Sequence, residues 1–195
     1  TTSREAYTRD NKEVQALMEK LEPAEDFYRV EKKTRKTKND GAWMNFPSVS
    51  LFSSTANADL TKFFKRMGCE ASTNAYSITG STPLVDSLLS VRYALYSEYI
   101  PNTDLVNYIQ ESGGTYLYEN LYTLPLGFVL PYDLADNWQY QMENPAEVQN
   151  DLCLLLGTDD VLVPVETEVS GSGCTFTADM AGEYYVYIQN KKVKN

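Results

Sequence analysis

The chain has 195 residues, of which 43% are hydrophobic and 23% are charged, and these proportions are typical of a folded globular domain. Its net charge of −10 argues against nucleic acid as a partner, because proteins that bind nucleic acid neutralise its phosphates with basic side chains. The absence of His excludes a Ser-His-Asp triad, a Cys-His pair and a His-ligated metal centre. The odd number of cysteines, three, also argues against a disulfide scaffold.

Motifs for bound cofactors and for nucleophilic catalysis are missing from the sequence. It contains neither glycine-rich nucleotide fingerprint and no GxSxG element, so we expect no cofactor and assign no catalytic residue. Without a calcium loop of the EF-hand type, no metal site is expected. Carboxylates are abundant, so a secreted carbohydrate-active hydrolase that uses two of them stays as an alternative. The candidate carboxylates for it are Glu111, Glu119, Asp133, Asp136, Asp159 and Asp160.

Two further features concern the kind of protein from which the sequence comes. No stretch approaches the roughly 20 apolar residues that a membrane-spanning helix needs. The chain begins Thr1-Thr2-Ser3, without an initiating Met or a signal peptide, and we expect it to be a piece of a longer protein whose targeting segments lie outside it. The working interpretation is therefore a water-soluble part of a larger protein.

In chain order, the first half alternates helical and extended segments. Asp10 is the expected cap of the first helix, with Glu13 in the capping-box position. Thr82 followed by Pro83 is the preferred start of another helix. The predicted segments are a helix over 10–22, strands over 27–31 and 46–52, helices over 60–67 and 83–89, and a strand over 91–96.

The second half changes character near Gly157, after which the pattern has a period of two and no helix signal. We therefore divide the chain into a mixed α/β domain over residues 1–157 and a β-rich extension over 158–195. The expected fold class is α+β, with a mixed β-sheet, helices packed on it and a small C-terminal all-β extension. The predicted segments are a helix over 103–110, strands over 116–119 and 124–130, a helix over 145–156 capped by Asn144, and strands over 161–165, 167–169, 174–177 and 183–189.

Seven short motifs follow one another in an order that resembles one family of bacterial proteins. They are Phe27-Tyr28-Arg29-Val30, Asn39-Asp40, the run 50–55 (SLFSST), the run 82–93 (TPLVDSLLSVRY), Leu117-Tyr118-Glu119-Asn120, Leu124-Pro125-Leu126-Gly127-Phe128, and the helix that opens with Asn144-Pro145. Together they cover roughly residues 27–157, and on them the chain resembles the YfhO family of bacterial polytopic membrane proteins. The basic run 32–38 lies outside this pattern, and the C-terminal β segment matches it only loosely.

The resemblance implies a parent protein with many membrane helices and the architecture of a glycosyltransferase that uses lipid-linked sugar donors. Such proteins are linked to the glycosylation of lipoteichoic acid or related cell-wall polymers. It implies that this chain is a domain on the extracytoplasmic face of the cell membrane, which positions an acceptor or a partner. The partner would be a cell-wall glycopolymer or a lipid-linked sugar, and the membrane would be reached through flanking segments. The residues that transfer sugar are expected in the membrane part, and a structural or protein-interaction module stays as an alternative.

Tyrosine is unusually frequent, with 15 residues, and it clusters in the second half of the chain. Glycan and polyol chains are commonly held by aromatic faces together with amide and hydroxyl groups. The alternative is that these rings line a core or a sheet face. The candidate ligand-binding residues are Tyr116, Tyr118, Asn120, Tyr122 and Trp138.

Six of the 17 basic residues fall within ten positions, 29–38. Such a strip would attract an anionic polymer or lipid headgroups to an otherwise acidic protein. The alternative is a solvated strand edge, where Lys prevents unwanted strand pairing. The candidate anion-binding residues are Lys32, Lys33, Lys36 and Lys38.

Four residues in these motifs, Arg29, Asn39, Asp40 and Asp86, are interpreted as structural. We expect the Arg29 guanidinium to pair with a carboxylate, and we expect Asn39-Asp40 to form a turn. Asp86 falls in the first turn of the helix that Thr82 starts, where the helix dipole favours a carboxylate. We therefore interpret Asp86 as an anchor and not as an acid catalyst.

Overall fold

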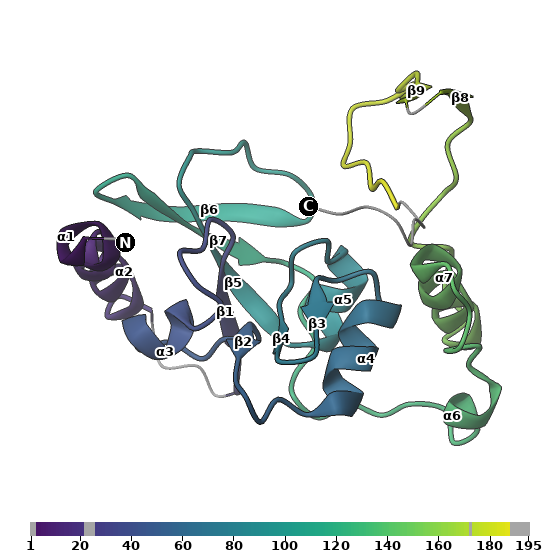
Figure 1. Ribbon diagram of the computed structural model, residues 1–195, viewed down its shortest axis with the longest axis horizontal. Coiled ribbons are helices and arrows are strands. Elements are labelled where there is room, and N and C mark those ends of the chain that lie inside the picture. The colour runs from purple at the N-terminus through teal and green to yellow at the C-terminus, as the bar shows by residue number, and fades with distance from the viewer. Residues whose placement is uncertain (1–2, 22–25, 172, 188–195) are drawn as a thin grey trace. The chain divides into compact units, whose positions relative to one another are not determined.

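The computed structural model describes residues 3–21, 26–171 and 173–187 (Figure 1). The chain separates into two compact units, Thr1–Leu130 and Pro131–Asn195. The boundary predicted at residues 157 and 158 therefore falls inside the second unit. No helix among the described residues is both long enough and apolar enough to cross a bilayer.

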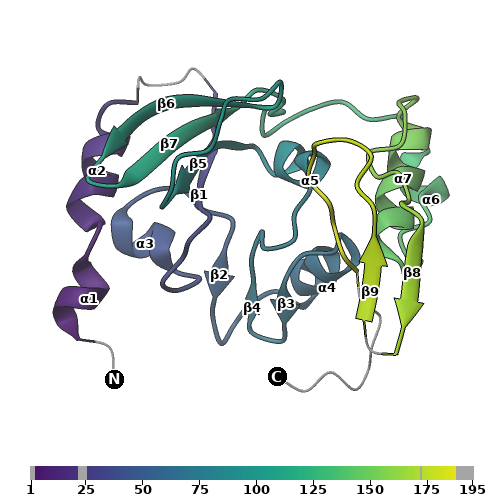
Figure 2. The same cartoon turned by 90° about the horizontal axis from the view of Figure 1, so that it is seen from above.

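The first unit is built on a four-stranded mixed sheet, whose strand order is β1-β5-β7-β6 (Figures 1 and 2). The strands are β1 (Arg29–Lys32), β5 (Val91–Tyr96), β6 (Val106–Ser112) and β7 (Thr115–Asn120). β1 pairs with β5 in parallel, whereas β5–β7 and β6–β7 are antiparallel. A mixed sheet with helices packed on it confirms the α+β class.

One face of this sheet is covered by helices from the beginning of the chain. These are α2 (Asn11–Met18) and α3 (Asp40–Met44), and the short helix α1 (Arg4–Thr8) precedes α2 in the chain. Side chains of α2 and α3 meet those of β1, β5 and β7 in one apolar core, because alternate strand residues point to the same face. Its buried members are Val14, Leu17, Val30, Met44, Phe46, Tyr93, Leu95 and Leu117.

A second, three-stranded sheet of the first unit consists of β2 (Leu51–Phe52), β3 (Ala71–Ser72) and β4 (Ala75–Tyr76). Helix α4 (Ala58–Arg66) packs on it, and the ring of Phe64 stacks on that of Tyr76 with centroids 4.5 Å apart. Helix α5 (Pro83–Leu88) then leads directly into β5. As predicted, the Thr82 hydroxyl accepts a hydrogen bond from the Val85 amide and caps this helix.

The second unit contains α6 (Leu134–Asn137), α7 (Pro145–Leu155) and the strand pair β8 (Thr167–Ser170) and β9 (Gly173–Phe176). The predicted cap of α7 is confirmed, because Asn144 Oδ1 accepts a hydrogen bond from the Ala146 amide. The buried apolar residues on α7 are Pro145, Val148, Leu152 and Cys153. The β8–β9 pair confirms that the chain ends in a small β extension.

Several predicted elements are wrong. Residues 103–110 do not form a helix: most of them belong to β6, which joins β7 through the tight turn Gly113-Gly114. Both glycines have a positive φ, 55° and 81°, which only glycine adopts without strain. Residues 124–130, 161–165 and 183–187 form no strand, and residues 188 and 189 lie outside the described residues. Asp10 makes no side-chain cap on α2.

Candidate functional site

The basic run forms a surface loop between β1 and α3, which we call the basic loop (residues 33–38). The loop borders an open hollow of about 460 Å³ on the surface of the first unit. The residues that line the hollow are Lys33, Thr34, Arg35, Lys36, Thr37, Lys38 and Glu70. Three of the four predicted anion-binding lysines therefore lie around one hollow, and Lys32 does not.

The shape of the basic loop is set by the residues that follow it. The buried Asp40 carboxylate accepts hydrogen bonds from the amides of Lys36 and Thr37, both at 2.8 Å, and from the Thr37 hydroxyl at 2.9 Å. Asn39 pairs with the backbone of Phe52 in β2 through its side-chain amide, with distances of 2.8 and 3.0 Å. Asn39 and Asp40 thus have the structural role that the sequence predicted.

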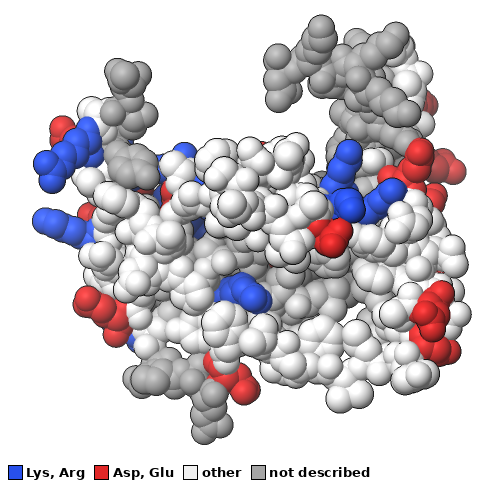
Figure 3. Space-filling view, turned by 60° about the horizontal axis from the view of Figure 1, so that its bottom comes forward, with Lys and Arg blue, Asp and Glu red and all other residues white. Residues whose placement is uncertain are grey.

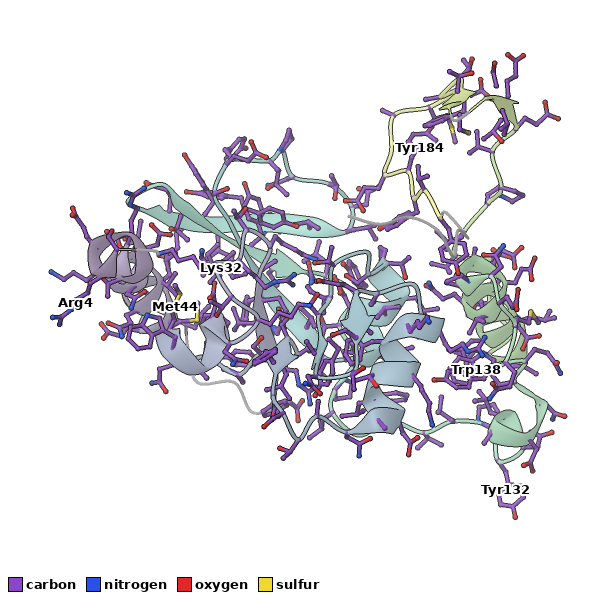
Figure 4. The ribbon with its side chains drawn as sticks, in the orientation of Figure 1. Arg4, Lys32, Met44, Tyr132, Trp138 and Tyr184 are labelled. Carbon is purple, nitrogen blue, oxygen red and sulfur yellow. The ribbon has the colours of Figure 1, made fainter. Side chains whose placement is uncertain are left out.

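Asp10 holds two of the predicted anion-binding lysines. Its carboxylate lies 3.7 Å from Lys32 Nζ and 3.5 Å from Lys36 Nζ. The Lys32 side chain is only 8% exposed and also donates to the Thr34 carbonyl, and Figure 4 shows it among other side chains of the first unit. Asp10 therefore serves as the counter-ion of Lys32 and Lys36, and it does not have the capping role that was predicted from its position.

Lys33 is paired with a buried carboxylate. Its Nζ lies 3.1 Å from Asp86 Oδ2, and Asp86 is 4% exposed. Burial alone lowers the pKa of Lys33, but the nearby Asp86 charge, aided by Tyr96 and Glu31, raises it above its ordinary value. Lys33 is therefore charged at neutral pH, and Asp86 is the anchor that the sequence predicted.

Glu70 is the one acidic residue that lines the hollow. Its carboxylate accepts hydrogen bonds from Lys38 Nζ at 2.7 Å, from the Ser77 hydroxyl at 2.7 Å and from Arg35 at 3.4 Å. Hydrogen bonds from Lys38 and Ser77 lower the pKa of Glu70 below its ordinary value. Because the Glu70 side chain is 47% exposed, its ion pairs contribute little to stability.

The charge of the basic run is therefore partly balanced by carboxylates from other parts of the chain. Asp10, Glu70 and Asp86 supply three negative charges to the five basic residues that they contact. On the face shown in Figure 3, Lys and Arg occur as separate small groups and not as one continuous positive area. Attraction of an anion to the basic loop would therefore be local and would depend on individual side chains.

Two of the predicted ligand-binding residues have their polar atoms bound to backbone groups. Tyr118 is fully buried, and its hydroxyl accepts from the Ile100 amide at 2.8 Å and donates to the Ile100 carbonyl at 2.9 Å. Burial is the main cause of the raised pKa of Tyr118. The Asn120 amide group is also buried and donates to the Val91 carbonyl at 2.8 Å. Both side chains fasten β7 to its neighbours.

Tyr116 and Tyr118 belong to a cluster of tyrosines on the sheet face opposite to α2. The rings meet edge to face, with centroids 5.2 to 6.2 Å apart. The members are Tyr96, Tyr99, Tyr108, Tyr116 and Tyr118. Sequence reasoning missed Tyr108 because residues 103–110 were predicted as a helix; alternation in β6 would have placed it beside Tyr118, its partner in the register.

The other predicted ligand-binding residues lie apart from this cluster. Tyr122 follows β7, and its carbonyl accepts a hydrogen bond from the Ser87 hydroxyl at 2.6 Å. Trp138 belongs to the second unit, where its indole N–H donates to the Val148 carbonyl at 2.9 Å (Figure 4). The structure thus brings Tyr116 and Tyr118 together, but Trp138 is in a different compact unit.

For Arg29, a carboxylate partner was predicted, and the contacts that the described residues show are with a carbonyl and an aromatic ring. Its guanidinium donates to the Leu89 carbonyl at 2.7 Å and lies over the Phe27 ring, 5.0 Å from the centroid. The carbonyl at the end of α5 is left without a helical partner, so a cation there satisfies it and complements the helix dipole. Arg29 therefore joins β1 to the end of α5 through a backbone carbonyl.

Two of the six carboxylates proposed for a hydrolase have structural partners. Glu119 pairs with Arg92 at 2.9 Å, and Glu111 accepts from the Gly114 amide in the β6–β7 turn at 2.6 Å. None of the six candidates lines the hollow beside the basic loop or the smaller one, of about 70 Å³, beside Lys32. Among the residues that the structure describes, no group of Cys, Asp and Glu is arranged to hold a metal ion.

Comparison with known protein families gives a match that covers most of the chain. The model of the family described as bacterial membrane protein YfhO matches residues 1–161, which is more than half of the chain. No curated protein and no solved structure matches the chain. The matched range includes the mixed sheet, the carboxylates Asp10, Glu70 and Asp86, and helix α7. The chain therefore belongs to the YfhO family of bacterial membrane proteins.

Proposed function

We propose that this chain is the extracytoplasmic domain of a YfhO-family membrane protein, and that its basic loop contacts an anionic cell-wall polymer. The parent protein would transfer sugar from a lipid-linked donor to lipoteichoic acid or a related polymer. The domain itself would hold the acceptor by its phosphates and would not carry out the transfer. The observation that carries this proposal is the hollow lined by Lys33, Arg35, Lys36 and Lys38 in a chain of net charge −10.

The existing ion pairs leave part of this charge available to a ligand. Lys38 and Glu70 form a pair at a half-exposed carboxylate, and Lys36 meets an Asp10 side chain that is 31% exposed. Pairs of this kind contribute about 0–1 kcal/mol, so a polymer with several phosphates can replace the carboxylates. Lys33 differs, because its partner Asp86 is buried. We therefore expect Lys36 and Lys38 to bind the polymer and Lys33 to keep the loop in place.

The test measures binding of linear polyphosphate and of purified lipoteichoic acid to this chain at low salt. The Lys36→Gln/Lys38→Gln variant should bind at least about tenfold more weakly, because each Lys near an anionic surface contributes about 1 kcal/mol. The matched control is Lys62→Gln/Lys65→Gln, which removes two positive charges from the exposed side of α4. Binding should also weaken as salt rises to about 1 M, where the screening length is only about 3 Å.

Two results would contradict the proposal. One is equal loss of binding in the α4 control, which would show that only the total charge matters. The other is the absence of any binding of the unmodified chain to either polymer at low salt. That result would favour the alternative in which the domain is a structural or protein-interaction module of the membrane protein.

A further inference from the structure

The longest uncharged segment at the end of the first unit follows β7. No Asp, Glu, Lys or Arg occurs between Glu119 and Asp133. Several apolar side chains in this segment are exposed to solvent, and exposed apolar patches often mark protein or membrane interaction sites. Their exposed fractions are 55% for Leu121, 58% for Leu126, 97% for Val129 and 41% for Leu130.

The beginning of this segment is firmly attached to the first unit. The Leu121 amide donates to the Leu105 carbonyl at 2.9 Å, and the Tyr122 carbonyl accepts from the Ser87 hydroxyl at 2.6 Å. The Leu124 amide donates to the Ser87 carbonyl at 3.4 Å. The apolar residues 125–130 therefore extend from a base that α5 and the loop before β6 hold in place, and we call them the apolar loop.

Three ligand classes differ in how well they fit the apolar loop. An anionic polymer would find no basic group in it, and a sugar would find few polar side chains. A lipid bilayer interface accepts exposed Leu, Val and Phe side chains while leaving backbone groups in contact with water. This last condition matters because residues 126–130 show no backbone hydrogen bond within the described part of the chain. Shallow insertion leaves these backbone groups in contact with water, whereas insertion into the hydrocarbon core would not.

We infer that the apolar loop, residues 125–130, rests in the interface of a lipid bilayer beside which the domain is held. A bilayer is expected close to this domain, because the chain belongs to a family of membrane proteins. Tyr122, just before the loop, is a residue of the type that favours the headgroup region. The contact is apolar, so its strength should depend little on salt and should not require anionic lipid. This inference does not depend on the polymer-binding role of the basic loop.

The test is flotation of this chain with vesicles of pure phosphatidylcholine. The unmodified chain should float with the vesicles, and Leu126→Glu/Val129→Glu should reduce the bound fraction about tenfold, because it places two charges in the apolar contact. The matched control is Val163→Glu/Val169→Glu, at two other exposed valines, 77% and 76% exposed. This control should bind like the unmodified chain. Circular dichroism of each variant should be unchanged, since all four side chains are exposed.

Three outcomes would overturn the inference. The chain fails to float at any lipid concentration, or the control loses binding as strongly as the loop variant. In the third, the chain floats only with phosphatidylglycerol and is released by Lys36→Gln/Lys38→Gln, which would assign membrane contact to the basic loop. Polyphosphate binding should be unchanged in the Leu126→Glu/Val129→Glu variant if the basic loop alone binds the polymer. Measuring it therefore distinguishes failure of this inference from failure of the proposed function.

Discussion

Lys33 Nζ and Asp86 Oδ2 lie 3.1 Å apart, and this ion pair joins the basic loop to the first turn of α5. The second Asp86 oxygen, Oδ1, is buried without a hydrogen-bond partner among the described residues. The carboxylate therefore depends on Lys33 for compensation of its buried charge. Loss of either partner leaves the other charge in a site that water reaches poorly.

The first prediction follows from this pair. Asp86→Asn should lower the free energy of unfolding by about 2–3 kcal/mol, because it leaves Lys33 without its main counter-ion. Urea denaturation measures the change. Asp59→Asn is the control, because Asp59 pairs with Lys62 at the surface with 89% of its side chain exposed, and it should change stability by less than about 0.5 kcal/mol. Equal effects of the two substitutions would show that the buried pair has no special role.

Glu31 is the second position where a buried carboxylate organises the backbone. It is fully buried, and it accepts hydrogen bonds from the Ser48 and Ser50 hydroxyls, at 2.7 and 2.9 Å, and from the Val49 and Ser50 amides. Glu31→Ala should destabilise the first unit by about 3 kcal/mol or more, because it leaves several buried donors unpaired. Ser48→Ala removes a single donor and should cost about 1 kcal/mol. A thermal melt in which both variants lose the same stability would refute this account.

A substitution of Glu70 should strengthen anion binding by the basic loop, whereas the lysine substitutions should weaken it. Glu70→Gln removes the carboxylate that competes for Lys38 and Arg35, so polyphosphate should bind several-fold more tightly, as expected for a gain of about 1 kcal/mol. The lowered pKa of Glu70 means that its small stabilising effect is complete above the ordinary carboxyl pKa and is lost as the pH falls through the lowered value. Titration calorimetry at pH 7 measures the affinity, and an unchanged or weaker affinity would contradict the role of the loop.

The cysteines should differ sharply in reactivity. Burial, and then the nearby Asp86 charge, raises the pKa of Cys69 to about 12, whereas Cys174 is exposed. At pH 8 iodoacetamide should therefore modify Cys174 and leave Cys69 intact until the protein unfolds, because the thiolate is the reactive form. Above pH 9 the unfolded chain loses the Cys69 proton first, so stability should fall as the pH rises. Mass spectrometry of the alkylated peptides measures the order, and early labelling of Cys69 would contradict its burial.

Local sequence signals were sufficient for the parts of the fold that depend on neighbouring residues. The caps Thr82 and Asn144 act on amides within three positions, and α4 and α7 follow from the spacing of their apolar residues. The order of the seven motifs also indicated the family that the family model then showed. These features need no information about the rest of the chain, because their interactions span a few residues.

The tertiary structure decided which distant groups meet. Residues 106–112 become a strand because β7 supplies a pairing partner through the Gly113-Gly114 turn, which overrides their helical spacing. The charge of the basic run is partly compensated because Asp10, Glu70 and Asp86, which lie far from it in sequence, fold against it. Arg29 satisfies a helix-end carbonyl for the same reason. Charge compensation depends on distance in space, so the sequence alone showed where the basic residues are but only the fold determined their counter-ions.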